Sequence, residues 1–522
     1  MNKVFKPLGI VAAVAAASAG YVNVANAQTV ANNALGDLAL VPYYTVNGEW
    51  ITGIHIVNTS AATQVVKFRF RRAVDSLDAL DFNIVMSPKD VYAGFLSDDE
   101  NGNISWSAGD TTCTVPVTTG GKLTMPSIYR EGAETGYVEI IGMGSPTSET
   151  APIALAAKHS GVSGDPALTP LDCTAVRSNF FADGTSAADP GVVDAATAWQ
   201  ATSAATAIKA GGANTFVDSG NVLKVSYFIR DNATGVEFGD NAVHIADFLG
   251  EPTMTNQQFG WLSGDLDGFD FPNLNGAAPR GGANVGLFNA LRQSDVLGVS
   301  ALLNEWTANP SNGAALDWVV TLPGQYTMMD TPQFVLALQD AADGETAAPE
   351  ITCTRANGCD YRDLPVTATV VPYNREETTT TLASGELTVS PALPGEATQL
   401  QLKKEVNVIT FGGNSVLGVS DTDITADLGQ NFGWLSLAVT SASADVRVCG
   451  WDYSSDTAGG AQESDAVLLA LQSCDDSVLA TVISPATGAV PMIGFAAWAR
   501  SVAANPDASY GRIVAHSFSS TS

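Results

Sequence analysis

Short segments in which hydrophobic and polar residues alternate recur along most of the chain. They are dense in β-branched and aromatic residues and are separated by Gly, Asn, Asp and Pro, which is the pattern of β-strands joined by turns. These segments are 38–46, 50–58, 64–72, 82–86, 91–96, 136–141, 222–230, 318–322, 364–371, 400–411, 434–439, 446–451 and 512–518. The pattern predicts a mainly β protein with two or more antiparallel β-sandwich domains, immunoglobulin-like or jelly-roll-like, carrying small helical insertions.

The connections add local predictions. Asn47-Gly48 lies between the first two segments and favours a tight hairpin, so we expect the chain to open as an antiparallel meander. Helical signal is thin: 193–210 is Ala-rich and ends at a Gly pair, and a second short candidate is 294–306. The stretches 98–126 and 144–189 are rich in Gly, Ser, Thr and Ala, and we expect them to be insertions or surface loops.

The first residues have the pattern of a secretory signal. Lys3 and Lys6 precede an uncharged run of Ala and Val, and Ala25-Asn26-Ala27 predicts cleavage after Ala27. The alternative, a membrane anchor, needs about 20 apolar residues, and this run is shorter. No later segment has the pattern of a membrane span. We expect a signal peptide at 1–27, an N-terminal sandwich at 28–250, a middle segment at 251–365 and a C-terminal sandwich at 366–522.

The balance of charge is strongly acidic. The chain has 54 Asp and Glu against 24 Lys and Arg, a net charge of −30, and removal of the signal lysines would make it −32. Nucleic acid is therefore disfavoured as a partner, because phosphate binding relies on basic side chains. Divalent cations suit such a surface better. Only 15% of residues are charged, which indicates a packed globular protein with an acidic exterior.

Six cysteines follow the signal, and an even number in an exported protein favours disulfides. Six cysteines allow fifteen connectivities, and proximity along the chain favours neighbours in order. The expected pairs are Cys113 with Cys173, Cys353 with Cys359, and Cys449 with Cys474. A zinc site is the competing interpretation, but the chain has no paired CxxC motif and four histidines.

Recognised catalytic motifs are absent from the sequence. There is no GxSxG elbow, HExxH or P-loop, and the histidines lack motif context; they are His55, His159, His244 and His516. We therefore expect no enzymatic activity and no catalytic residue. A hydrolase of extracellular polymers, built from scattered carboxylates, is the less favoured alternative.

Clustered carboxylates suggest a cation site. Asp265, Asp267 and Asp270 lie in a glycine-containing loop, and carboxylate and backbone oxygens together are what Ca²⁺ prefers. They are our predicted Ca²⁺ ligands. The acidic turns at 98–103 and 421–427 are similar, but no loop matches a full EF-hand, and solvated acidic turns are the competing interpretation.

Exposed aromatic side chains could instead form a platform for a sugar. Trp50, Trp318, Trp434 and Trp451 lie in or beside strand patterns, however, which favours core packing over stacking on a ligand. A polysaccharide-binding adhesin or binding module is therefore the alternative function.

Through short sequence motifs spread over its length, the chain resembles a group of exported β-rich proteobacterial proteins of largely unknown function, including surface-layer and biofilm-matrix proteins of marine gammaproteobacteria. The resemblance rests on 40–44 (LVPYY), 54–59 (IHIVNT), 317–323 (DWVVTLP) and 493–497 (IGFAA). It implies a secreted structural protein that assembles into a lattice. Six cysteines depart from the usual composition of surface-layer chains.

The predicted function is a secreted structural protein of the Gram-negative cell surface. We expect it to self-assemble as a surface-layer or matrix component. We expect Ca²⁺ to promote this assembly, because divalent ions would relieve the repulsion between protomers of charge −32. The expected partners are further copies of the chain, with a cell-surface polysaccharide as the alternative.

Overall fold

A computed structural model describes the parts of the chain that form the sheets and their connections. The described residues are 28–74, 78–99, 101–125, 130, 132–159, 169–177, 180, 202–203, 216–249, 252–254, 272, 274, 296–307, 314–323, 366–373, 399–402, 404–413, 415–419, 422–424, 432–442, 490–500, 502 and 508–519. Within them, antiparallel sheets dominate, and the predicted fold class of sandwich-like β domains is confirmed.

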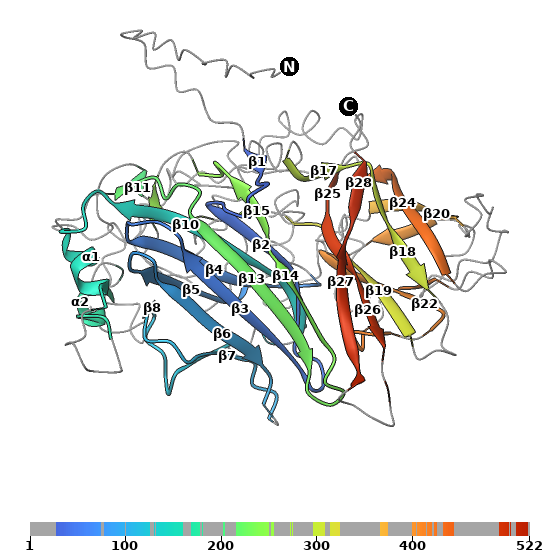
Figure 1. Ribbon diagram of the computed structural model, residues 1–522, viewed down its shortest axis with the longest axis horizontal. Coiled ribbons are helices and arrows are strands. Elements are labelled where there is room, and N and C mark those ends of the chain that lie inside the picture. The colour runs from blue at the N-terminus through green and yellow to red at the C-terminus, as the bar shows by residue number, and fades with distance from the viewer. Residues whose placement is uncertain are drawn as a thin grey trace, which may run out of the picture.

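Two sheets form the first sandwich, on the left of Figure 1. The eight-stranded sheet has, in spatial order, β1 (Thr29–Val30), β15 (Val243–Ala246), β2 (Leu38–Thr45), β10 (Thr135–Pro146), β4 (Gln64–Arg72), β5 (Asp78–Met86) and β8 (Cys113–Val115), with β12 (Phe216–Val217) beside β10. The six-stranded sheet has β14 (Glu237–Asn241), β13 (Leu223–Asp231), β3 (Trp50–Asn58), β6 (Val91–Ser97), β7 (Ser105–Ala108) and β9 (Lys122–Thr124). Their facing side chains bury a large aromatic cluster around Phe68, Phe82 and Trp106.

Two five-stranded sheets form the second sandwich, on the right of Figure 1. The middle sheet has β23 (Thr422–Ile424), β22 (Val406–Phe411), β19 (Ala314–Thr321), β26 (Ile493–Arg500) and β27 (Tyr510–Ala515). The outer sheet has β21 (Gln399–Leu402), β20 (Val366–Tyr373), β24 (Phe432–Ala442), β18 (Ala301–Thr307) and β28 (Ser517–Ser519). Strands from 301–321 thus pair with strands from the last third of the chain.

Minor elements complete the description. Two short strand pairs are β11 (Thr202–Ser203) with β16 (Thr253–Met254), and β17 (Gly298–Val299) with β25 (Val490–Pro491). Among the described residues the named helices are α1 (Pro152–Ala157) and α2 (Cys173–Arg177). No helix in the described part of the chain has the length and apolar character needed to cross a bilayer.

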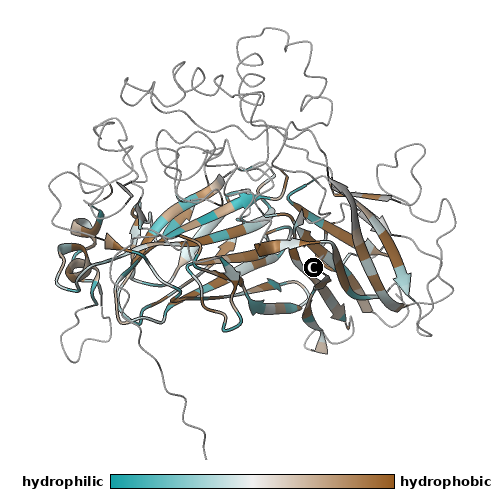
Figure 2. Cartoon of the chain, turned by 90° about the horizontal axis from the view of Figure 1, so that it is seen from above, coloured by the Kyte–Doolittle hydropathy of each residue, from teal (hydrophilic) through white to brown (hydrophobic). Residues whose placement is uncertain are grey.

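The middle sheet is buried on both faces. Side chains alternate along a strand, so Trp318 and Val320 of β19 point into the core of the second sandwich, whereas Val319 points toward the first. Phe495 on β26 likewise lies in the core of the first sandwich, 6.5 Å from the ring of Tyr43. The middle sheet therefore separates two hydrophobic cores and contributes one face to each of them. Figure 2 shows hydrophobic bands along the strands of both sandwiches.

A side-chain hydrogen bond ties the two sandwiches together at this boundary. The Thr321 hydroxyl donates to the carbonyl of Pro42 at 2.5 Å, and both residues are buried. At the neighbouring edge, β14 and β27 lie so close that a Cβ at Gly511 would come within 2.5 Å of the Phe238 ring. These contacts fix the middle sheet against the first sandwich.

Three local predictions were wrong. The Asn47-Gly48 turn does not close a hairpin: β2 pairs with β10 and β15, β3 pairs with β6 and β13, and the turn carries the chain between sheets. In the described part of 294–306, residues 296–297 are helical, whereas 298–299 lie in β17 and 301–306 lie in β18. The stretch 98–126 contributes three strands, β7, β8 and β9, to the first sandwich.

The predicted helix at 193–210 and the strand at 446–451 fall outside the described residues, except that Thr202–Ser203 is the strand β11. The predicted strand at 400–411 is divided into β21 and β22. The stretch 144–189, expected to be a loop, includes α1 and α2.

Candidate functional site

The predicted Ca²⁺ ligands Asp265, Asp267 and Asp270 lie outside the described residues. The similar turn at 98–103 is described, and there the Asp99 carboxylate accepts the backbone N–H groups of Asn101 and Asn103 at 2.8 and 2.9 Å. Hydrogen bonds from the side chain and backbone of Asn103 lower the pKa of Asp99. In the described segments, no three His, Cys, Asp or Glu side chains gather into a metal-binding group. The Ca²⁺ site stays a prediction.

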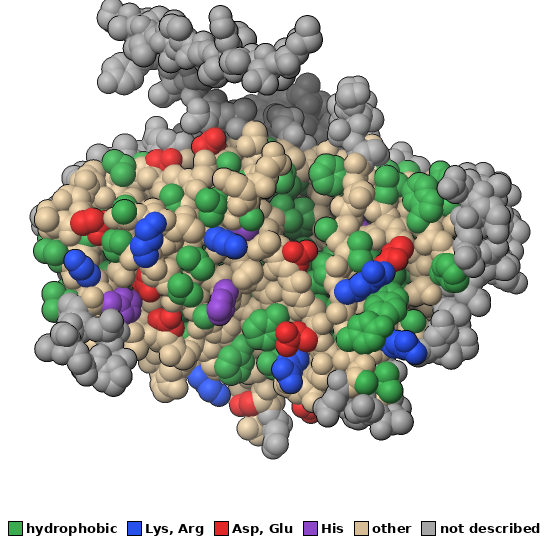
Figure 3. Space-filling model, in the orientation of Figure 1, with side chains coloured by type: hydrophobic (Ala, Val, Ile, Leu, Met, Phe, Trp, Pro, Cys, Tyr) green, Lys and Arg blue, Asp and Glu red, His purple; other side chains and the backbone are tan. Residues whose placement is uncertain are grey.

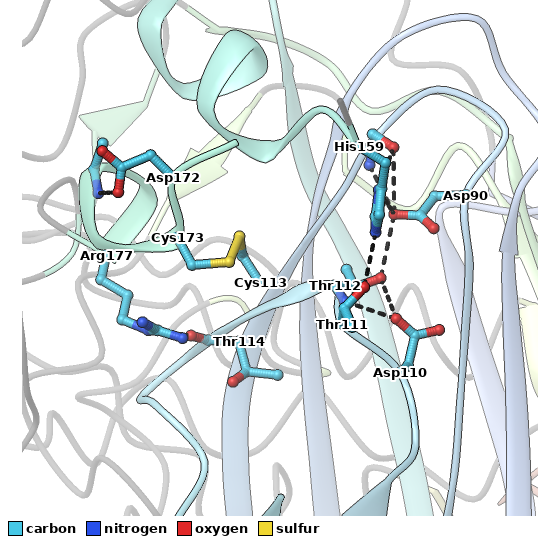
Figure 4. The surroundings of a disulfide bond; sticks show 12 residues. Asp90, Asp110, Thr111, Thr112, Cys113, Thr114, His159, Asp172, Cys173 and Arg177 are labelled. Atoms are coloured by element: carbon cyan, nitrogen blue, oxygen red, sulfur yellow. Dashed lines mark hydrogen bonds and ion pairs between the residues drawn. A yellow bond between two sulfur atoms is a disulfide. The ribbon is translucent and has the colours of Figure 1, made fainter. Parts of the chain in front are cut away.

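Cys113 and Cys173 form a disulfide, the pair favoured by their order along the chain. Figure 4 shows the bond joining β8 to the start of α2. Cys113 of β8 is completely buried. Arg177 of α2 donates a hydrogen bond to the carbonyl of Thr114, next to Cys113, at 2.9 Å. The bond therefore holds the two short helices on the end of the first sandwich. The other four cysteines fall outside the described residues.

His159 lies beside this disulfide and contacts three chain segments. Its Nε2 is 3.3 Å from the Thr111 hydroxyl and its Nδ1 is 3.2 Å from the Ser87 hydroxyl, while the Asp90 carboxylate is 3.8 Å from Nδ1 (Figure 4). Burial raises the pKa of Asp90, and His159 opposes that shift. A hydrolytic triad requires a direct hydrogen bond donated by the imidazole N–H to the carboxylate, and a separation of 3.8 Å is too long for one. The geometry supports a structural role for His159.

The outer face of the eight-stranded sheet carries a buried ladder of charges. Directly opposite residues on three strands alternate in sign, with Arg69 of β4 between Glu139 of β10 and Asp81 of β5. Lys67 lies 2.8 Å from Asp81, and Arg71 lies 2.5 Å from Glu139. These side chains are at most 1% exposed, so two carboxylates pair with three basic groups inside the protein and the cluster is covered from solvent. The alternating basic residues of β4 are the signal in the sequence that indicates this ladder.

Two buried carboxylates hold loops by their backbone N–H groups. Asp37 accepts from Phe248 and Leu249, each at 2.8 Å, in the first sandwich. Asp317 accepts from Val416 and Leu417, at 2.7 and 2.9 Å, in the second. Burial raises the pKa of each carboxyl to about 7, although these hydrogen bonds oppose the rise. Both groups are sensitive to pH near neutrality.

Two buried histidines support the sheets through hydrogen bonds. The His516 ring contacts the side chain of Asn304 at 2.9 Å and the carbonyl of Val319 at 3.0 Å, and burial lowers its pKa to about 4. The Nε2 atom of His244 accepts the N–H of Val225 at 2.8 Å, and burial lowers its pKa also to about 4. Both rings are therefore neutral at pH 7 and support the sheets.

Exposed aromatic and charged side chains form a continuous band on the second sandwich. It begins on the outer sheet, where Tyr373 stacks on Trp434 with ring centroids 4.2 Å apart and planes 6° from parallel. Trp434 lies directly opposite Glu305 on the next strand, and Glu305 forms an ion pair with Arg512 of the middle sheet. We call these residues and their continuation the aromatic band; its members are Tyr373, Trp434, Glu305, Arg512, Trp498 and Tyr510.

The band continues from the outer sheet onto β26 and β27 of the middle sheet. Arg512 lies over the ring of Trp498, 5.2 Å from its centroid, and the rings of Trp498 and Tyr510 are 5.4 Å apart. Trp434 is 39% exposed and Tyr510 49%. Figure 3 shows hydrophobic side chains gathered with basic and acidic ones over the part of the molecule where β26 and β27 lie.

Trp434 thus differs from the expectation of core packing, whereas Trp50 and Trp318 are buried and Trp451 lies outside the described residues. Strand alternation alone places Trp434 and Leu435 on opposite faces but does not say which face is covered. The aromatic band is the candidate binding surface.

Comparison of the chain with protein-family models, curated proteins and solved structures finds no match in any of the three.

Proposed function

We propose that this chain is a secreted structural protein of the Gram-negative cell surface, which self-assembles as a surface-layer or extracellular-matrix component. The observation that carries the proposal is the middle sheet, buried on both faces, because it unites two sandwiches in one block. Copies joined through defined surfaces can form a regular assembly only if each copy keeps its shape. A disulfide in the first sandwich supports an oxidising compartment, and hence export.

An exposed sheet edge supports self-association. β28 is the last strand of the outer sheet among the described strands, and its Phe518 is 62% exposed. Edge strands offer unpaired backbone groups to a neighbouring chain, and soluble proteins usually protect them with charged residues or prolines. The sequence of β28 is Ser-Phe-Ser, which has neither.

Ca²⁺ enters this proposal as the ion that brings acidic copies together. A chain of charge −30 repels its neighbours, and divalent ions screen or bridge carboxylates more effectively than monovalent ions. The predicted ligands are Asp265, Asp267 and Asp270.

The test is assembly of the mature chain in Ca²⁺ and in chelator, observed by negative-stain microscopy and sedimentation. We expect ordered assemblies in Ca²⁺ that dissolve in chelator, and fewer of them for Phe518→Ser. Phe95→Ser is the matched control, since Phe95 is also exposed, at 43%, but lies on an internal strand of the six-stranded sheet. A chain that remains monomeric in both conditions contradicts the proposal.

Binding of a cell-surface polysaccharide is the second candidate function. The exposed rings of Trp434 and Tyr510 favour it, because aromatic side chains with an apolar body and a polar tip suit partly wet contacts. A glycan array probed with the mature chain and with Trp434→Ala tests it. Binding that persists unchanged in the variant would exclude this ring as the sugar contact.

A further inference from the structure

We infer that the aromatic band is an interface at which a second copy of this chain docks through a two-fold axis. The inference rests on the proposed self-association and names the surface that performs it. Trp, Tyr and Arg are the residues most enriched among those that dominate the binding energy of protein interfaces. Five of the six members of the band are of these types, and all six are at least partly exposed.

The rings of the band favour a protein partner over a sugar. A sugar stacks on the open face of an aromatic ring, but Tyr373 already covers one face of Trp434 in nearly parallel contact. Arg512 likewise lies over the ring of Trp498. Each of these two tryptophan rings thus already has a neighbour from its own chain over its plane. Interlocking side chains of a folded partner can fill such a surface, whereas a flat sugar ring gains little from it.

Charge selects a second copy as the partner. Glu305 and Arg512 lie side by side, so a copy rotated by two-fold symmetry can place its Arg512 on this Glu305 and its Glu305 on this Arg512. The pair is about half exposed, at 40% and 54%, and is therefore accessible for exchange. Arg500, opposite Tyr510 on the neighbouring strand, adds a further positive charge. The band itself carries one acidic and one basic side chain, and Arg500 lies beside it, in a chain whose net charge is −30. Two acidic copies repel one another less when they meet through a surface that is not acidic.

The location agrees with the fold. The band crosses the edge of the second sandwich where β18 and β27 meet, close to β28 at the edge of the outer sheet. β14 of the first sandwich borders β27, but the helices and disulfide of that sandwich lie at the other end of the molecule in Figure 1. A dimer joined through the band would therefore leave the first sandwich of each copy available for other contacts.

Charge reversal with complementation tests the interface. Dimerisation of the mature chain is measured by analytical ultracentrifugation for wild type, Glu305→Arg, Arg512→Glu and an equimolar mixture of the two variants. Each single variant places like charges opposite each other, and we expect its dissociation constant to rise by about tenfold or more. In the mixture, a heterodimer pairs opposite charges at both contacts, so its dissociation constant should return toward that of wild type.

Complementation keeps the inference separate from a folding defect and from the proposed function. An exposed ion pair contributes about 0 to 1 kcal/mol, so circular dichroism and thermal unfolding should show both variants folded. If wild type dimerises but neither variant weakens it, or the mixture does not recover, the interface lies elsewhere and only this inference fails. If wild type is monomeric with and without Ca²⁺, the proposed self-association fails with it. Glycan binding that Trp434→Ala abolishes, without dimerisation, would assign the band to a sugar instead.

Discussion

Replacing Asp317 should change how stability depends on pH. The carboxylate is fully buried, and one of its oxygens, Oδ2, accepts from the Ser415 hydroxyl and from the N–H groups of Val416 and Leu417. Burial raises its pKa from 3.8 to about 7. The folded protein then keeps a proton that the unfolded chain has lost between these two values. Stability must therefore fall as pH rises from about 4 to about 7.

The size of the effect follows from the shift. One pKa unit corresponds to about 1.36 kcal/mol, so the rise from 3.8 to about 7 represents about 4 kcal/mol at most. Asp317→Asn keeps an oxygen for the three donors but does not titrate, so this part of the pH dependence should vanish. Asp317→Ala removes the acceptor, and the orphaned donors should lower the free energy of unfolding by about 2 to 5 kcal/mol across this pH range.

The assay is urea unfolding of the oxidised mature chain, followed by tryptophan fluorescence at pH 5, 6, 7 and 8. Asp37→Asn is the internal comparison, because burial also raises the pKa of Asp37 to about 7. Asp37 and Asp317 together make the free energy of unfolding fall with rising pH, and each single Asn variant should remove about half of that slope. Asp240→Ala is the control, since this exposed carboxylate accepts only the N–H of its neighbour Asn241 among the bonds described. Equal slopes for wild type and Asp317→Asn would refute the reasoning, as would an Asp317→Ala protein as stable as wild type.

Two further predictions concern the first sandwich. Replacing Cys113 and Cys173 together by Ser should cost about 4 kcal/mol, because the bond closes a loop with a sequence separation of 60; thermal unfolding checks this, and an unchanged midpoint would contradict it. Gly53→Ala should destabilise by about 1 to 3 kcal/mol, since its new methyl group would lie 2.0 Å from the Phe228 ring. Gly109→Ala has open space and should be neutral in the same denaturation experiment; equal effects of the two alanines would show that the Phe228 contact is unimportant.

Alternation of side chains predicted most of the strands, because it reports which residues face a core. It could not predict how the strands are ordered. Asn47-Gly48 requires only a local turn with positive φ at Gly48, and such a turn can join two sheets as well as two neighbours in one sheet. At 294–306 the spacing of the apolar residues fits both the helical period of about 3.6 and the strand period of 2. Residues 301–306 form a strand because they pair with β24 and β28.

The candidate site was harder to predict than the strands because its residues are distant in sequence. Glu305 and Arg512 are 207 residues apart, and no spacing rule links them. Trp434 has the same alternating context as buried tryptophans, and only the finished sandwich shows that its face is open. The Cys113–Cys173 pair was easier, since it required only that neighbours in order come together.

The doubly covered middle sheet also limits how this protein can be taken apart. If residues up to 250 were removed, Val319 and Phe495 would lose their cover and a hydrophobic face would meet water. Neither half is then a self-sufficient module, and melting should follow a single cooperative transition. Proteolytic trimming, gene fission or transfer of one half to another chain would each leave a fragment with an exposed hydrophobic face, which favours aggregation.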